Sequence, residues 1–414
     1  MHHHRWKILG FGFAANASFS AVISGLPATS VLMRSAYGVD TAAVGAAIGA
    51  TGLGIALSEV PWGLLTDRFG DRRVLLVGLT LTTMVLAAMA VWLAPGAPHA
   101  WTLLVAALGL IGLVGGSVNG ASGRAVMSWF DASERGLAMS IRQTALPAGG
   151  VLGALLLPTV VSLWGFAAAY AALAALCAAC VASTFAWLHE PPAAPGEPAA
   201  RSAVHKSTVL RDGRVWRMVI GMGLLCASQI AVLAFTAVFL HDVAHLDVGL
   251  TTAAMVIYQI GAAVLRVWSG RWTDRKGNRH AFLQGSSVVA AGVFVVLALL
   301  SVAAGHAHGS PMLSTLLFIV IAAGGVAASC WNGIAFTELA VQAGPSNVGT
   351  ALGLGNTFIF GSYFLTPLLV PPLVALGGWP LAWTSVAICA LAAGPLLGSQ
   401  STRRLSPRSG ASAS

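Results

Sequence analysis

The sequence predicts an all-α membrane protein with twelve transmembrane helices arranged in two related halves. Three observations lead to this fold class. The 414-residue chain is 57% hydrophobic and only 8% charged, whereas soluble domains carry roughly 25% charged residues. Apolar runs of about 20 residues, enough to cross a bilayer as a helix, recur along the chain. A short charged motif also occurs twice, half a chain apart.

The apolar runs define the expected helices in chain order. Twelve such runs joined by short loops argue against buried helices of a soluble protein. The first half contributes six predicted spans: 8–32, 41–65, 74–94, 101–126, 137–163 and 166–188. The second half contributes six more: 216–239, 250–272, 281–304, 312–336, 348–374 and 379–398.

A polar stretch separates the two sets of six runs. Residues 190–214 contain four prolines followed by four basic residues, which is typical of a linker. We therefore expect an N-terminal six-helix bundle at 1–189, a cytosolic linker at 190–214 and a C-terminal bundle at 215–400. Residues 401–414 are expected to form a disordered cytosolic tail. The first apolar run is too long for a cleavable signal peptide, so none is expected.

The placement of charge predicts the orientation. Nearly all of the 22 Lys and Arg residues fall at the two termini or in the even-numbered loops. Cytosolic loops carry such an excess, so both termini are predicted to be cytosolic and the chain to lie in the inner membrane. The net charge of +9 reflects this bias, and no nucleic-acid partner is expected.

The repeated motif follows the second and the eighth run at an offset of 207 residues. The first copy is GLLTDRFGDRR from residue 63 and the second is GRWTDRKGNR from residue 270. Both resemble the G-x-L-x-D-R-x-G-R-R signature of the major facilitator superfamily, although Asp71 and Asn278 stand where that family usually has a basic residue. The resemblance implies two pseudo-symmetric six-helix bundles, alternating access and a gating role for Gly63, Asp67, Arg68, Gly70, Arg72, Gly270, Asp274, Arg275 and Gly277.

Other residues repeat at a slightly larger offset. Asn119 and Asn332 stand 213 residues apart, as do Gln143 and Asn356. A shared register of this kind indicates that one half arose from the other by duplication and fusion.

Polar residues within the runs mark a predicted interior. The resemblance implies that spans three, six, nine and twelve are peripheral and that the others surround a cavity. Charged groups inside a span are costly unless they are paired or face water, and here the polar residues fall almost entirely on the cavity-forming helices. The predicted substrate-binding residues are Asn119, Arg142, Gln143, Gln229, Tyr258, Gln259, Arg266, Asn332 and Asn356.

Glu59 and Arg266 occupy equivalent positions in the two halves. Each stands eight residues before the Asp of its motif, which is about 12 Å along a helix and close to mid-membrane. Glu59 is predicted to be the only acidic residue inside a span and to carry the coupled proton. Arg266 is either an anchor for a substrate anion or the ion-pair partner of Glu59.

A second group of charges lies nearer the cytosolic side. Arg124 is near Asp67 by topology and near Glu134 in sequence. The family often uses charges here to close the cytosolic side, so Arg124 and Glu134 are predicted to take part in the gate. The five cysteines all fall in spans, so no disulfide framework is implied.

Together these features predict a secondary active transporter that moves a small organic anion with protons by alternating access. One alternative is an exporter of neutral or cationic drug-like compounds, and another is a membrane sensor that uses the same fold without transport. No pairing of nucleophile and base indicates an enzyme. No cofactor or metal is expected, and the expected partners are the small-molecule substrate, protons and the bilayer, with the protein as a monomer.

Overall fold

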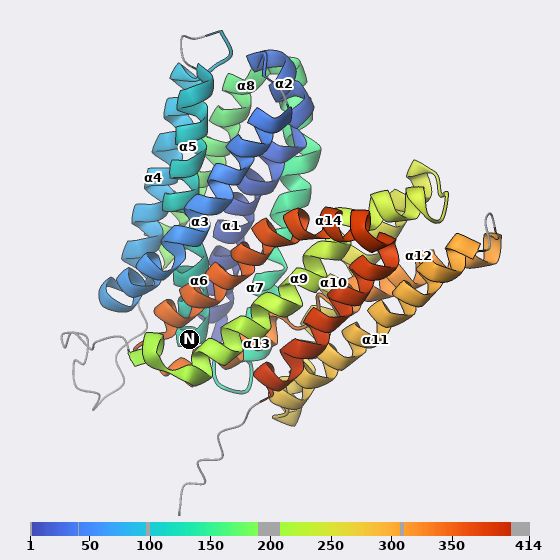
Figure 1. Cartoon of the computed structure of the whole chain (residues 1–414). Helices are drawn as coiled ribbons and strands as arrows, with labels where there is room; N and C mark the ends of the chain where they lie inside the picture. The colour runs from blue at the N-terminus through green and yellow to red at the C-terminus, as the bar shows by residue number, and fades with distance from the viewer. Residues whose placement is uncertain (1, 40, 97–99, 189–207, 307–309, 399–414) are drawn as a thin grey trace, which may run out of the picture.

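The computed structural model describes residues 2–39, 41–96, 100–188, 208–306 and 310–398, and within them it is helical, with no β-strand. Figure 1 shows two groups of long helices, one from each half of the chain. The first group comprises α1 (His2–Ala28), α2 (Ser30–Tyr37), α3 (Thr41–Phe69), α4 (Asp71–Trp92), α5 (Ala100–Gly115), α6 (Ser117–Trp129), α7 (Arg135–Gln143) and α8 (Ala145–Trp187).

The second group follows a short 3₁₀ turn. That turn, η1 (Thr208–Arg211), lies within the predicted linker, of which residues 190–207 are outside the described residues, as is the predicted tail 401–414. The helices are α9 (Gly213–Asp242), α10 (Val248–Lys276), α11 (Arg279–His306), α12 (Pro311–Ala327), α13 (Asn332–Ala343) and α14 (Val348–Leu397).

Twelve membrane crossings result once two long helices are divided. In the described part of the chain, ten helical segments are long and apolar enough to span a membrane. Two of them contain non-helical residues: α8 breaks at Gly165 (φ 80°), and α14 breaks at Gly377 and Gly378 (φ 70° at Gly378). A positive φ is strained for residues with a Cβ, so glycine permits the chain to reverse there. The twelve-span fold class is thereby confirmed.

Several predicted spans differ in detail. The first run divides at Thr29 into α1 and α2, and the fourth divides near Gly116 into α5 and α6. The tenth divides into α12 and α13 and extends to Ala343. The helices that are long and apolar enough to span a membrane thus include Glu338, and they include Asp67 and Asp274 near their ends, so the prediction that Glu59 is the only acidic residue in a span is wrong. The apolar periodicity ends before Glu338, but the helix does not.

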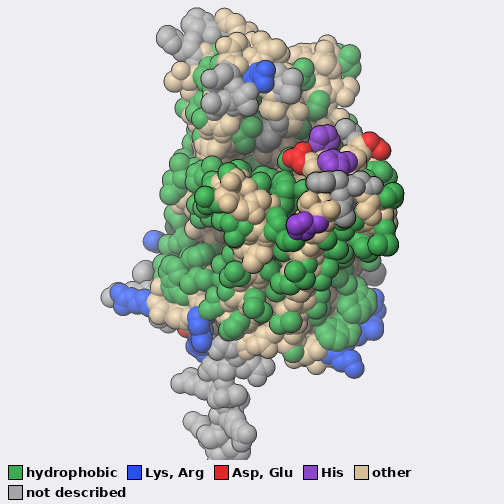
Figure 2. Space-filling model, turned by 45° about the vertical axis from the view of Figure 1, so that its right-hand side comes forward, with side chains coloured by type: hydrophobic (Ala, Val, Ile, Leu, Met, Phe, Trp, Pro, Cys, Tyr) green, Lys and Arg blue, Asp and Glu red, His purple; other side chains and the backbone are tan. Residues whose placement is uncertain are grey.

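Each half packs around its own buried core. One cluster draws its buried residues from 8–188, and the other draws them from 209–397 together with Met127 and Met139. Large apolar side chains also cover much of the outer surface (Figure 2). Lipid can solvate such a surface, whereas a soluble monomer would rarely expose so much apolar area. The two-bundle boundaries given above remain a prediction.

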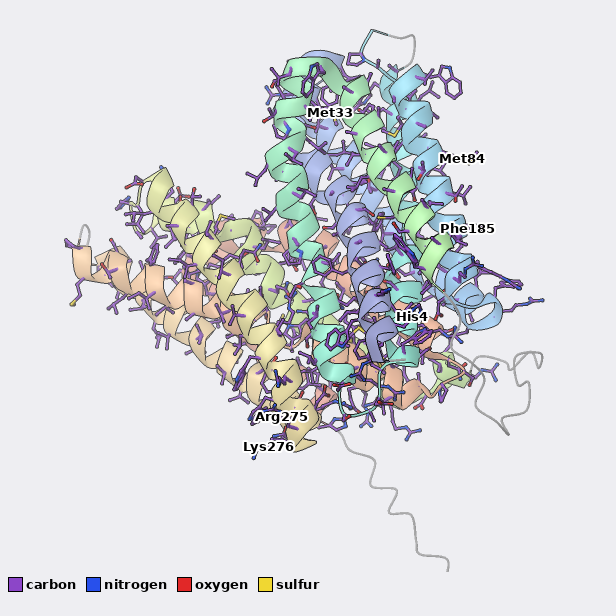
Figure 3. The ribbon with its side chains drawn as sticks, turned by 180° about the vertical axis from the view of Figure 1, so that it is seen from behind. His4, Met33, Met84, Phe185, Arg275 and Lys276 are labelled. Carbon is purple, nitrogen blue, oxygen red and sulfur yellow. The ribbon has the colours of Figure 1, made fainter. Side chains whose placement is uncertain are left out.

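The two halves meet at one end of the molecule and diverge at the other. Contacts between halves join α3 to α14 and α6 to α14, and α7 to α10 and α13. We call this the charged end; it carries the loops 69–71, 130–134, 277–278 and 344–347, and Lys and Arg side chains gather there (Figure 2). Figure 3 places His4, Arg275 and Lys276 toward it and Met33 toward the opposite, open end.

Candidate gating and substrate site

Each motif aspartate caps a helix of the opposite half. The carboxylate of Asp67, at the end of α3, accepts hydrogen bonds from the main-chain N–H groups of Gly349 and Thr350 (both 2.7 Å) and from Thr350 Oγ1 (2.6 Å). These donors belong to the first turn of α14, where N–H groups have no intrahelical acceptor. A negative charge is also favoured at that end of a helix.

The second motif repeats this contact. Asp274, near the end of α10, accepts from the main-chain N–H groups of Gly136 (3.0 Å) and Leu137 (2.8 Å) in the first turn of α7. The aspartates differ by 207 positions and their partners by 213, which are the two offsets of the internal repeat. The charged end is therefore held by a pair of pseudo-symmetric helix caps.

Arginines orient both aspartates. Arg124 of α6 lies 3.5 Å from Asp67 and 2.5 Å from Asp71, measured between nitrogen and oxygen atoms. Asp71, which departs from the family signature, thus shares that arginine with the motif. On the other side Arg279 donates to Asp274 (2.7 Å) and to the carbonyl of Ala132 in the opposite half (3.0 Å).

The remaining predicted gate residues are four glycines and four charged residues. Gly63 and Gly270 lie where helices of opposite halves cross, since a Cβ at either position would overlap main-chain atoms of the partner helix. Gly70 and Gly277 have positive φ values of 85° and 66° at the helix ends. The other polar members contact their own half: Arg68 stacks on Phe69, Arg72 donates to Phe185, and Glu134 pairs with Arg5. Arg275 is exposed.

Glu59 lies one layer further from the charged end and joins the halves through amides. Its side chain is 0% exposed. Oε1 accepts from Asn119 Nδ2 of α6 (2.5 Å), and Oε2 accepts from Asn356 Nδ2 of α14 (3.2 Å). Each carboxyl oxygen thus accepts one hydrogen bond, one from each half of the protein.

Arg266, in the second half, likewise bonds to a residue of the first half. Its Nε donates to the carbonyl of Ser329 (3.0 Å), and its Nη1 donates to the carbonyl of Gln143 in the opposite half (2.9 Å). The side chain is 5% exposed. No described residue accepts a hydrogen bond from Nη2, and no ion pair joins Arg266 to Glu59. The acceptors of the guanidinium are two neutral main-chain carbonyls, and its Nη2 has no acceptor among the described residues.

Arg142 is buried inside the first half. Its Nε and Nη2 donate to Ser122 Oγ (3.0 and 2.8 Å), and Nη2 makes a further short bond to the carbonyl of Asn119. With its amide oxygen turned toward the guanidinium, Asn16 accepts from the same two nitrogens and donates to Asn119 Oδ1. Asn119 therefore connects Arg142 with Glu59.

The other predicted binding residues line the second half. Asn332 donates to Gln229 Oε1 (3.1 Å), joining α13 to α9. The hydroxyl of Tyr258 is buried and has no hydrogen-bond partner among the described residues. Gln259 is partly exposed, two turns from Arg266 on α10. Gln143 reaches the site through its carbonyl, so its side-chain amide is not the group that Arg266 uses.

Sequence reasoning missed several participants. Ser122, Ser329 and Thr350 supply hydroxyl or main-chain groups, which carry no distinctive sequence signal. The pair between His280 and Glu338 (3.0 Å) was also missed, because it depends on α13 extending past the apolar run. The equivalence of Gly349 to Gly136 at offset 213 could have indicated the α14 cap.

Comparison with known proteins gives three consistent results. The family model described as Major Facilitator Superfamily matches residues 9–367. The chain is 30% identical over 393 residues to the uncharacterized MFS-type transporter Rv2994 of Mycobacterium tuberculosis, covering 95% of this chain and 84% of that protein. It is 29% identical over 144 residues to the probable galactarate/D-glucarate transporter GudP of Bacillus subtilis, covering 34% of this chain and 31% of that one.

The fold is shared with solved structures at low sequence identity. The structure of the proton:xylose symporter XylE bound to 6-bromo-6-deoxy-D-glucose superposes with a TM-score of 0.70 at 14% identity, and the match covers 95% of each chain.

Proposed function

This chain belongs to the major facilitator superfamily, and we propose that it is a secondary active transporter that carries a small organic anion together with a proton. Family membership and the apolar helices make it a multi-pass membrane transporter rather than an enzyme. The anion, the coupling to protons, and a cytosolic location for the charged end belong to the proposal. The observation that carries it is the buried, unpaired Arg266.

A buried guanidinium without a counter-ion favours an anionic ligand. An unpaired cation inside a membrane protein is costly unless it meets a partner, water or substrate. Among the described residues, Arg266 has only neutral acceptors and none of them bonds to its Nη2. A carboxylate bound there would complete its hydrogen bonding and offset its charge. The similarity to GudP, a probable galactarate/D-glucarate transporter, agrees with an organic acid as substrate.

Glu59 is suited to carry the proton because its ionisation state decides a contact between the halves. As a carboxylate it accepts from Asn119 of its own half and from Asn356 of the other. A proton on Oε2 would remove the negative charge and make that oxygen a poorer acceptor, which would weaken its hydrogen bond from Asn356. Protonation would thereby loosen the halves near the charged end.

These parts define a transport cycle. The anion enters from the open end, where the halves diverge, and binds Arg266. The carboxylate adds negative charge near Glu59, which favours protonation of Glu59. The weakening of the Glu59–Asn356 bond then allows the charged end to open by rocking of one half against the other.

The decisive experiment separates exchange from proton-driven uptake in proteoliposomes. Arg266→Gln is expected to abolish anion binding, and Arg266→Lys to restore it only partly, since Lys lacks the planar fork of the guanidinium. Arg271→Gln, on the exposed face of the same helix, is the matched control. Wild-type affinity in Arg266→Gln would rule out the anchor.

For the proton, Glu59→Gln is expected to lose accumulation driven by a proton gradient while retaining anion exchange. Glu338→Gln removes a different buried carboxylate and should retain coupled uptake. Full proton-driven uptake by Glu59→Gln would exclude Glu59 as the carrier. Loss of exchange as well would indicate that Glu59 is needed for the movement of the halves rather than for coupling to protons.

A further inference from the structure

Glu59 is linked to a buried arginine through two amide side chains. Arg142 Nε and Nη2 donate to the amide oxygen of Asn16 (3.1 and 2.9 Å), and the amide nitrogen of Asn16 donates to Asn119 Oδ1 (2.9 Å). Asn119 Nδ2 then donates to Glu59 Oε1 (2.5 Å). These groups come from α7, α1, α6 and α3, and each of the four residues is at most 3% exposed. We call Arg142, Asn16 and Asn119 the amide relay.

The amide relay can run in only one direction. A guanidinium has N–H donors and no acceptor, whereas a side-chain amide has an acceptor at one end and donors at the other. Turning either amide would place its N–H₂ group against another donor in a buried site, which is unfavourable. Arg142 also donates to the main-chain carbonyl of Asn119, which fixes the backbone that carries this amide. Asn119 is therefore held with its N–H₂ group toward Glu59.

The amide on the other side of Glu59 has no such restraint. Asn356 donates to Glu59 Oε2 (3.2 Å), and no described residue donates to Asn356 Oδ1. A proton on Oε1 would find no acceptor in Asn119, whereas a proton on Oε2 can be donated to Asn356 Oδ1 once that amide turns. The bond between the halves then joins two neutral groups, and it is weaker than a bond to a carboxylate.

The second half has the amides but not the arginine. Gln229, Asn332 and Gly355 stand 213 residues after Asn16, Asn119 and Arg142. Asn332 donates to Gln229 (3.1 Å), which is the opposite direction to that of the first half, and Gly355 has no side chain to set the direction. The arginine thus belongs to the half that carries the buried carboxylate.

The helices that pack against α3 bring few other charges toward Glu59. Helices α5 and α14 have no charged side chain, and Arg124 of α6 pairs with Asp67 and Asp71. The phenols of Tyr37 and Tyr363 ionise only above the range in which a carboxyl does. The remaining charged or histidine residues of these helices and of α3 lie at the helix ends: His2, His3, His4, Arg5, Lys7, Arg34, Arg68, Arg72 and Arg73.

We infer that Arg142 and Asn16 are positioning residues of the proton site: they hold Asn119 as a donor to Glu59 Oε1 and leave the proton to Oε2, the oxygen that Asn356 of the opposite half contacts. This inference rests on the proposed function, because Glu59 is the proton carrier there. It assigns Arg142 and Asn119 to the proton site rather than to the substrate.

The test follows closure of the charged end as the pH changes, in the purified full-length protein. Asn347→Cys in a background free of native cysteines is labelled with N-ethylmaleimide. Each rate is divided by that of the same protein carrying Glu59→Gln, so that ionisation of the thiol cancels. As the pH rises and Glu59 loses its proton, labelling should become about fivefold slower, the effect of about one hydrogen bond. The midpoint pH of this change reports protonation of Glu59.

The variants separate the amide relay from the charge of Arg142. Asn16→Leu keeps the arginine but frees Asn119 to turn, so the midpoint should rise by about one pH unit, a tenfold change in proton affinity. Arg142→Gln should raise it at least as far. Arg142→Lys should keep it near the starting value, because an ammonium group also only donates. Ser18→Ala, at another buried polar residue of α1 that bonds within its own helix, is the matched control.

An unchanged midpoint in Asn16→Leu would overturn the inference. If Arg142→Gln still raised the midpoint, the charge of Arg142 would act without the amides. If both variants changed the labelling rate equally at every pH, their role would be structural only. No pH dependence in the protein with Glu59 intact would instead reject Glu59 as the proton carrier, and the inference with it.

Discussion

The two helix pairs that join the halves, α3 with α14 and α10 with α7, share one plan but carry opposite charges at their centres. In each pair a motif aspartate caps the partner helix, a glycine allows close approach, and a buried charged residue reaches across one layer further in. That residue is Glu59 on α3 and Arg266 on α10. The two pairs share their geometry and differ in the chemistry of the central position.

The difference lies in what each charged residue meets. Glu59 depends on a side chain of the other half, Asn356, and the bond changes when the carboxyl gains a proton. Arg266 meets a main-chain carbonyl, that of Gln143, which stays an acceptor at any pH. The α3–α14 contact therefore depends on a titratable side chain. The α10–α7 contact rests on a main-chain acceptor, and no described residue accepts a hydrogen bond from Arg266 Nη2.

The largest effect is expected at a glycine where helices of the two halves cross closely. Gly63→Ala would drive a Cβ into the main chain of Gly349 and Thr350, which cannot yield cheaply. Overpacking of this kind costs about 1–3 kcal/mol. We expect transport to fall about tenfold, and thiol labelling of Asn347→Cys at the charged end to rise in a background free of native cysteines.

The same change in the other pair tests the shared plan. Gly270→Ala should be similarly damaging, because its Cβ would meet the main chain of Gly136. Gly52→Ala, on α3 but with no atom within 4 Å, should behave as the wild type. Full activity in either Gly63→Ala or Gly270→Ala would show that the two crossings are not equivalent in the working protein.

Replacing the two capping aspartates should have moderately different effects on closure of the charged end. Asp67 accepts three hydrogen bonds from the other half and Asp274 accepts two main-chain ones. Replacing either with Asn leaves donors unsatisfied, at about 1–3 kcal/mol. We expect Asp67→Asn to raise charged-end labelling more than Asp274→Asn does. The reverse order would show that the cap made by Asp274 of α10 contributes more to closure than the cap made by Asp67.

Truncating the residue that bonds to the central charge should weaken closure of the charged end for Glu59 but not for Arg266. Asn356→Ala removes the cross-half donor to Glu59 and should weaken closure by about 1 kcal/mol. Gln143→Ala keeps the carbonyl that Arg266 uses and should leave closure unchanged. Labelling rates of the two variants provide the comparison. If Gln143→Ala lowers anion affinity at unchanged labelling, its amide binds substrate, as the sequence predicts.

The smallest effect is expected at Ser140, which stands 213 residues before Gly353. Its hydroxyl is buried in the α10–α7 pair without a partner among the described residues. Ser140→Ala deletes a buried hydroxyl that makes no hydrogen bond, so it should not lower stability. Thermal unfolding in detergent measures this, and a clear destabilisation would indicate that the hydroxyl has a bonding role.

The sequence by itself determined the fold class, because span length, apolar composition and a repeated charged motif are local properties. It also singled out Glu59, Arg266 and both motif aspartates, since charge inside or beside an apolar run is conspicuous. Only the tertiary structure decided their partners. Asp67 bonds to main-chain groups 282 and 283 residues away, and Glu59 to an amide 297 residues away. Main-chain donors exist at every position, so no residue pattern reveals which helix end a carboxylate will cap.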